Sequence, residues 1–331
     1  MTSRRSAKPF SLCNKPRGAV SRDKVVEKIE YYNRRTKKCL GIVESHRLLK
    51  IGHQAGAFER YPKDPEKMSI DTADILELMK KSFEDYRLDG IEIDIQIDKK
   101  NIIDEGVRDI YVVHNKLEIN LAPYAVDYLK RNTLRKVIMG FIDAKYHEKD
   151  KHIYIEIKCD DSKRLDIRDE AAISGALDVI DEAVKSYSAG EAEAICKYIG
   201  FASFNYMALE RIAELAKGQH DLFFIVASNR ALGWIATKTI YPHFNYLGKR
   251  LEKVLLRAEF LTGVWFDPCA VNDFARIFNG INREREGNLL LKPLKVFVST
   301  YLLKKKEYFD RLENEREKLR NVEGLFFETK G

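Results

Sequence analysis

Long apolar runs and paired cysteines are both missing from this sequence of 331 residues. No stretch approaches the roughly 20 apolar residues that span a bilayer, and the first residues lack the apolar core of an export signal. The five cysteines are scattered and form no Cys-x-x-Cys pair, which argues against a disulfide framework and a zinc site. Repeats, low-complexity tracts and motifs that read DNA or RNA are also missing. We therefore expect a cytoplasmic protein with reduced thiols that binds no nucleic acid.

Positive charge is concentrated near the N-terminus. Of 58 basic and 51 acidic residues, positions 1–40 hold 12 and 3, which leaves 46 and 48 for the rest. The start of this segment is polar and broken by prolines, whereas residues 23–39 have the apolar spacing of a helix. We expect residues 1–45 to be a basic N-terminal extension, partly disordered and then helical. Residues 1–40 could bind an anionic membrane surface, or form no more than a solvated leader.

Apolar β-type runs alternate with helical segments from residue 46 to the end. Eight strands in this β/α order predict a single α/β domain over residues 46–331, a (β/α)₈ TIM barrel. A further run at 110–114 is expected to be the returning arm of a hairpin. In such barrels the chemistry lies at the carboxyl ends of the strands. The eight barrel strands are expected to start near residues 48, 90, 153, 198, 222, 263, 294 and 324.

Ionisable side chains occur within or just after four of these apolar runs. Because side chains alternate between the two faces of a strand, Glu92 and Asp94 must point the same way, and so must Glu156 and Lys158. Such groups are costly in a plain core. An isolated Glu-x-Asp strand also fits an exposed edge, but four segments together indicate a site for a metal ion and a phosphate. The segments are Gly-His-Gln (52–54), Gly-Ile-Glu-Ile-Asp-Ile-Gln (90–96), Val-Val-His-Asn (112–115) and Ile-Glu-Ile-Lys (155–158).

This ordered set resembles the glycerophosphodiester phosphodiesterases, within the phosphatidylinositol-phospholipase-C-like superfamily, whose pattern reads GHR, G-x-E-x-D-x-Q, V-x-H-D and E-x-K. Segments 200–205, 295–300 and 322–327 are also similar to the family, so the resemblance covers residues 46–331. Gln54 replaces the Arg of the family's GHR motif, and Asn115 replaces the Asp that follows His in its V-x-H-D motif. The family's small insertion after the second His is lacking, as in the related phospholipase D toxins, but those carry Asp where this chain has Glu156.

The resemblance implies a metal-dependent phosphodiester hydrolase that releases glycerol phosphate and an alcohol. It implies that His53 and His114 act as acid and base. Three hard oxygen donors suit one divalent cation, Mg²⁺ or Ca²⁺. Lys158 could equally be a simple ion pair, and Phe297 a core residue. The expected metal ligands are Glu92, Asp94 and Glu156, and the expected substrate or phosphate contacts are Lys158, Gln54 and Phe297.

Three functions stay open at this point. The first is a glycerophosphodiesterase that acts on a soluble deacylated phospholipid. The second is a lipid phosphodiesterase of the phospholipase D or sphingomyelinase D kind, peripheral to a membrane through its basic arm and acting on a lysophospholipid. The third is a non-catalytic barrel that binds phosphate esters or a protein partner.

Overall fold

The computed structural model gives the arrangement of most of the chain. It describes residues 21–53, 55, 74–97, 110–113, 129–159, 164–226, 255–266, 268–299, 305–314 and 318–327. Two residues of the predicted site, Gln54 and His114, lie outside these ranges.

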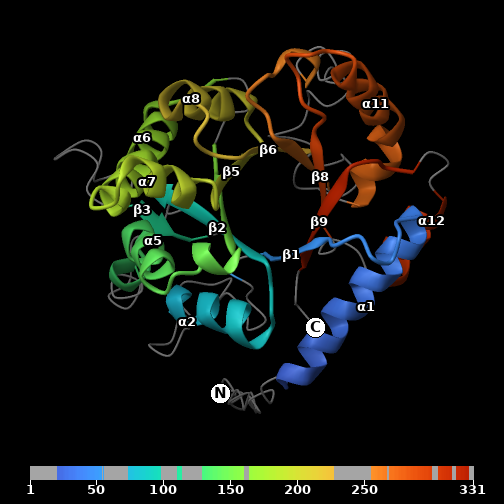
Figure 1. Cartoon of the computed structure of the whole chain (residues 1–331), viewed down its shortest axis with the longest axis horizontal. Helices are drawn as coiled ribbons and strands as arrows, with labels where there is room; N and C mark the ends of the chain where they lie inside the picture. The colour runs from blue at the N-terminus through green and yellow to red at the C-terminus, as the bar shows by residue number, and fades with distance from the viewer. Residues whose placement is uncertain are drawn as a thin grey trace, which may run out of the picture.

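A closed barrel of eight parallel strands forms the centre of the molecule. In the sheet order β1-β9-β8-β7-β6-β5-β4-β2, each strand pairs with its neighbour, and β1 also pairs with β2, so the sheet closes on itself. The short β3 pairs antiparallel with the end of β2, as expected for the hairpin arm. Figure 1 shows the ring of strands enclosed by helices. The predicted TIM barrel is confirmed. Its strands are β1 (Leu49–Gly52), β2 (Gly90–Ile97), β3 (Ile110–Val112), β4 (His152–Ile157), β5 (Ile199–Ser203), β6 (Leu222–Val226), β7 (Gly263–Phe266), β8 (Lys295–Ser299) and β9 (Val322–Phe327).

Helices between the strands cover the outside of the barrel. The helix after β1 begins where Asp74 accepts a hydrogen bond from the Leu76 N–H, 2.9 Å away. The helices are α1 (Arg22–Leu40), α2 (Ile75–Lys80) continued by the π-helical η2 (Lys81–Asp85), α5 (Leu134–Asp143), the 3₁₀ turn η3 (His147–Lys149), α6 (Ile167–Val184), α7 (Ala189–Cys196), α8 (Tyr206–Ala216), α11 (Pro268–Glu286) and α12 (Lys305–Asn314).

Aromatic rings fill the barrel interior beneath its carboxyl end. Phe297 is only 1% exposed, and its ring stacks on Phe223 with centroids 4.6 Å apart and meets Tyr154 edge-on at 5.6 Å. Glycine makes room for these rings, since a Cβ on Gly263 would lie 2.8 Å from the Phe223 ring. The Phe297 side chain therefore packs in the barrel interior, at the level of the aromatic layer, and its contact with substrate stays a prediction.

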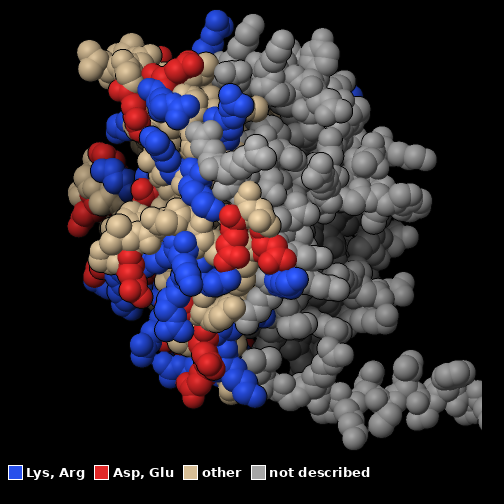
Figure 2. Space-filling view, turned by 90° about the vertical axis from the view of Figure 1, so that its right-hand side faces the viewer, with Lys and Arg blue, Asp and Glu red and all other residues tan. Residues whose placement is uncertain are grey.

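Helix α1 lies against the outside of the barrel beside α12. Its Tyr32 stacks on Phe309 of α12 and meets Phe327 of β9 edge-on. An ion pair of 2.5 Å joins Arg35 to Glu313. Acidic and basic side chains are mixed over the described part of this face (Figure 2). Residues 21–40 of the basic segment thus pack on the barrel, and membrane binding through residues 1–40 stays a prediction.

None of the described helices is both long and apolar enough to cross a bilayer.

Candidate active site

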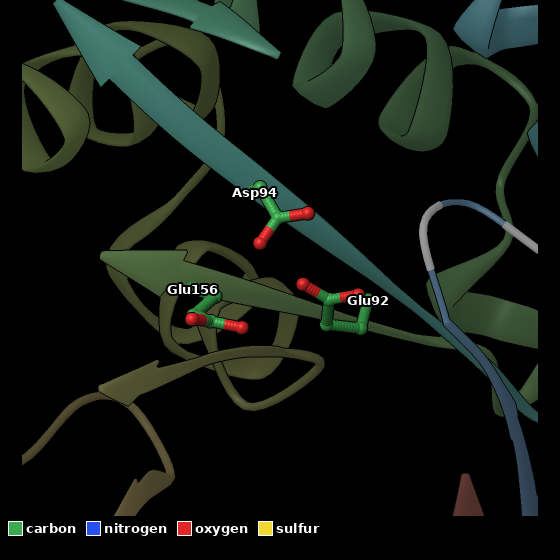
Figure 3. A group of neighbouring side chains, drawn as sticks. All are labelled: Glu92, Asp94 and Glu156. Atoms are coloured by element: carbon green, nitrogen blue, oxygen red, sulfur yellow. The ribbon is translucent and has the colours of Figure 1, made fainter. Parts of the chain in front are cut away.

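Three carboxylates gather at the carboxyl end of two neighbouring strands. Glu92 and Asp94 come from β2 and Glu156 comes from β4, where it is the register partner of Asp94. All three are buried, at 0%, 2% and 3% exposure. Figure 3 shows their carboxylates directed into one common space between the two strands. The shared face follows from strand periodicity, and the approach of Glu156 follows from the parallel register of β2 and β4.

The spacing of these carboxylates fits a single cation. Each residue offers one oxygen, and the three oxygens lie within 4.8 Å of one another. Two metal–oxygen bonds of about 2.3–2.6 Å, as calcium forms, span this separation, and the shorter bonds of magnesium, about 2.0–2.1 Å, require a slightly tighter set. Oxygen is the donor type that both ions prefer. Glu92, Asp94 and Glu156 therefore have the donor chemistry and the spacing of a divalent-cation site.

Lys158 places a positive charge directly beside two of these carboxylates. Its ammonium lies 2.8 Å from Asp94 Oδ1 and also pairs with Glu156 Oε1. Burial on its own lowers the pKa of this lysine, but the charges of Asp94, Glu156 and Glu92 outweigh that and raise the pKa well above the usual value. The three carboxylates thus favour the charged form of the Lys158 side chain.

Glu156 has a carboxyl group that is hard to ionise in the absence of a metal ion. Burial raises its pKa to about 7; the nearby Asp94 charge also raises it, and Lys158 acts in the opposite direction. A bound cation would favour the ionised form, so cation binding at this site is expected to release a proton near neutral pH.

His53 stands at the edge of the acidic cluster. Its Nε2 lies 3.7 Å from Glu92 Oε2, and its side chain is 9% exposed. The backbone around it is tied on both sides. The His53 N–H donates to the Phe327 carbonyl, and the Ala55 N–H donates to the Glu92 carbonyl. The imidazole is therefore held beside the three carboxylates by the junction of β1 with β9 and β2.

The structure brings together five of the eight residues predicted for the site. His53, Glu92, Asp94, Glu156 and Lys158 meet at the carboxyl end of the barrel. Phe297 lies in the interior, and Gln54 and His114 lie outside the described residues. The chain before His114 does reach the site, because the Val113 N–H donates to the Asp94 carbonyl at 3.0 Å.

Sequence reasoning overlooked Ser203, which ends β5 beside this cluster. Its hydroxyl donates to the carbonyl of Ile157, the residue between Glu156 and Lys158. The available signal was a hydroxyl residue at the end of an apolar strand, two positions before the Asn that caps the next helix.

Comparisons with known proteins do not place the chain in a family. No protein-family model and no curated protein matches it. Among solved structures it is similar to a calcium-dependent phosphoinositol-specific phospholipase C from a Gram-negative bacterium, Pseudomonas sp. The two share 9% identity with a TM-score of 0.34, over 72% of this chain and 80% of that chain. A likeness this distant carries no argument about function, so the family suggested by the motifs stays a prediction.

Proposed function

We propose that this barrel is a metal-dependent phosphodiester hydrolase. The observation that carries the proposal is the buried set of three carboxylates at the carboxyl end of β2 and β4, with the imidazole of His53 and the ammonium of Lys158 in contact with it. Burying charged groups of this kind lowers the stability of a fold, so such groups are concentrated at sites that bind ligands or carry out chemistry.

The balance of charge supports a divalent cation. Three ionised carboxylates and one ammonium leave two negative charges in a site shielded from water. A divalent ion neutralises that excess, and it would offset the burial and the nearby Asp94 charge that raise the pKa of Glu156.

Each described side chain then has a defined task. Glu92, Asp94 and Glu156 would hold a divalent cation, which would supply positive charge for the phosphoryl group. Lys158 offsets the negative charge that grows on the phosphoryl group as the P–O bond to the leaving alcohol breaks. His53 Nε2, beside Glu92, is placed to take up or release a proton at the reacting oxygens. We propose His114 as the second proton-transfer group, and this assignment rests only on the Val-Val-His-Asn segment at 112–115.

The finer proposal is a glycerophosphodiester substrate, which is cut to glycerol phosphate and an alcohol. It rests on the order and spacing of the four sequence segments. The new P–O bond forms with water, or first with the neighbouring glycerol hydroxyl to give a cyclic phosphate that water opens. Turnover of a lysophospholipid would instead support the second function, a lipid phosphodiesterase of the phospholipase D or sphingomyelinase D kind.

The test uses the purified full chain, freed of metal with a chelator and then supplied with Mg²⁺ or Ca²⁺. The substrates are glycerophosphocholine, lysophosphatidylcholine and bis(p-nitrophenyl)phosphate. We expect hydrolysis that needs the cation and that is lost in Asp94→Asn. The matched control is Asp89→Asn, at a buried carboxylate that pairs with Arg47 beside the opposite, amino-terminal ends of the strands.

Three outcomes are informative. Cation-dependent turnover of a diester in the wild type but not in Asp94→Asn supports the proposal. Cation binding without turnover of any of the three diesters favours the non-catalytic barrel. Turnover that chelator leaves unchanged would overturn the metal-dependent mechanism.

A further inference from the structure

The Ser203 side chain holds the end of β4 at the point where its backbone pairing with β5 ends. The register between β4 and β5 ends at Glu156 and Ala202. One residue further along, the Ser203 hydroxyl donates to the Ile157 carbonyl at 2.9 Å. This carbonyl belongs to the residue between Glu156 and Lys158, so the bond extends the β4–β5 connection into the acidic site.

Ser203 is itself anchored to the start of α8. Its hydroxyl oxygen accepts the Asn205 N–H at 3.0 Å, and the Asn205 side chain accepts the Met207 N–H at 2.8 Å as the cap of that helix. The Asn205 amide also donates to the Arg164 carbonyl in the chain that leaves β4. Ser203 and Asn205 are 0% and 1% exposed, so water does not compete for these bonds.

The residue between these two approaches the charged head of Lys158. The ring centroid of Phe204 lies 5.9 Å from Lys158 Nζ, within the range of a cation–π contact. The ammonium therefore has an aromatic ring on one side and the carboxylates of Asp94 and Glu156 on another. The three consecutive residues 203–205 thus contact the end of β4 at Ile157, Lys158 and the chain that follows.

We propose that residues 203–205 form a positioning clamp, which sets the separation of Glu156 and Lys158 from Asp94 that cation binding requires. The inference rests on the proposed function and assigns this segment a role within the same site. Residues that do not bind the metal themselves but hold its ligands in place have a strong effect on metal affinity. Their loss weakens binding, because the ligands must already have the right geometry before the ion binds. Ser203 is the key residue, since its hydroxyl joins β4, β5 and α8.

The test measures cation affinity of the metal-free full chain by calorimetric titration with CaCl₂ and MgCl₂, far below the unfolding temperature. Ser203→Ala removes the hydroxyl, and Ser203→Thr keeps it. The control is Ile212→Val, which trims a buried side chain of α8 that has no part in the clamp. A second variant, Asn205→Ser, keeps a capping oxygen but loses the amide donor to Arg164.

We expect Ser203→Ala to weaken the affinity for both cations by about 10–100-fold, the usual effect of removing a residue that positions metal ligands without binding the metal. Ser203→Thr should recover most of this loss, Asn205→Ser should show a smaller loss, and Ile212→Val should lower only the unfolding temperature. With a diester that is turned over, the loss should appear in kcat at saturating cation more than in KM.

Two results would count against the inference, and they are distinct. If the wild type binds the cations and Ser203→Ala binds them as well as Ile212→Val does, the clamp has no positioning role while the proposed function survives. If the wild type binds neither cation, the proposed function fails and the clamp fails with it. Should Ser203→Ala not fold, equal affinities of Asn205→Ser and the wild type would overturn the inference.

Discussion

The Lys158 ammonium lies 2.8 Å from Asp94 Oδ1, although the two residues belong to β4 and β2 and are far apart in the chain. The ammonium provides positive charge among three buried carboxylates, and the carboxylates in turn hold its pKa well above the usual value. This mutual dependence makes the site sensitive to any change in its charge.

Lys158→Met should destabilise the metal-free protein by about 3–5 kcal/mol, because it leaves the buried carboxylates without their ammonium. Added Ca²⁺ or Mg²⁺ should then stabilise this variant more than it stabilises the wild type. Denaturant unfolding with chelator and with each cation measures both effects. An unchanged free energy of unfolding would mean that Lys158 does not stabilise the carboxylates.

Glu156→Gln should remove a pH dependence of stability in the metal-free protein. The folded-state pKa of Glu156 is raised to about 7 from an ordinary value of 4.5, so the unfolded chain releases the proton first as pH rises. Wild-type stability should therefore fall between about pH 4.5 and 7 and level off above, by an amount on the order of 1–3 kcal/mol. The variant should lack this fall but also lose cation binding. Parallel stability curves for the two proteins would contradict the raised pKa.

His53→Gln should lower cation-dependent hydrolysis by about 10²–10⁴-fold, the usual contribution of a proton-transfer group. Its cation affinity should stay close to that of the wild type, because the three carboxylates remain. Steady-state kinetics and calorimetric titration separate the two effects. His220→Gln is an instructive comparison, since His220 is a buried histidine that bonds the Ile199 carbonyl far from the acidic cluster. It should affect stability but not turnover of the folded protein, and equal kinetic losses in both variants would deny His53 a special role.

Phe297→Leu should destabilise the protein without changing KM for a diester. The ring is 1% exposed and packs on Phe223, Tyr154 and Phe326, so the shorter side chain leaves unfilled space in the interior. We expect a loss of about 1–3 kcal/mol, smaller than for truncation to alanine. Thermal unfolding and kinetics on one substrate are sufficient. A clear rise in KM with unchanged stability would instead support a contact between Phe297 and the substrate.

The sequence by itself determined the fold and much of the donor set. Alternation with period two is a local property, so it revealed the strands and showed that Glu92 shares a face with Asp94 and Glu156 with Lys158. The count and order of strands then led to the barrel, which places those residues at one end. This information is contained in short stretches of chain and does not depend on packing.

Only the tertiary structure decided how those faces meet. The register of β2 against β4 brings Glu156 opposite Asp94, and closure of β1 onto β2 and β9 brings His53 to Glu92. The same packing assigned Phe297 to the interior and gave Ser203 its bond to Ile157. Register and burial depend on contacts between segments distant along the chain, whose free energies no local pattern contains.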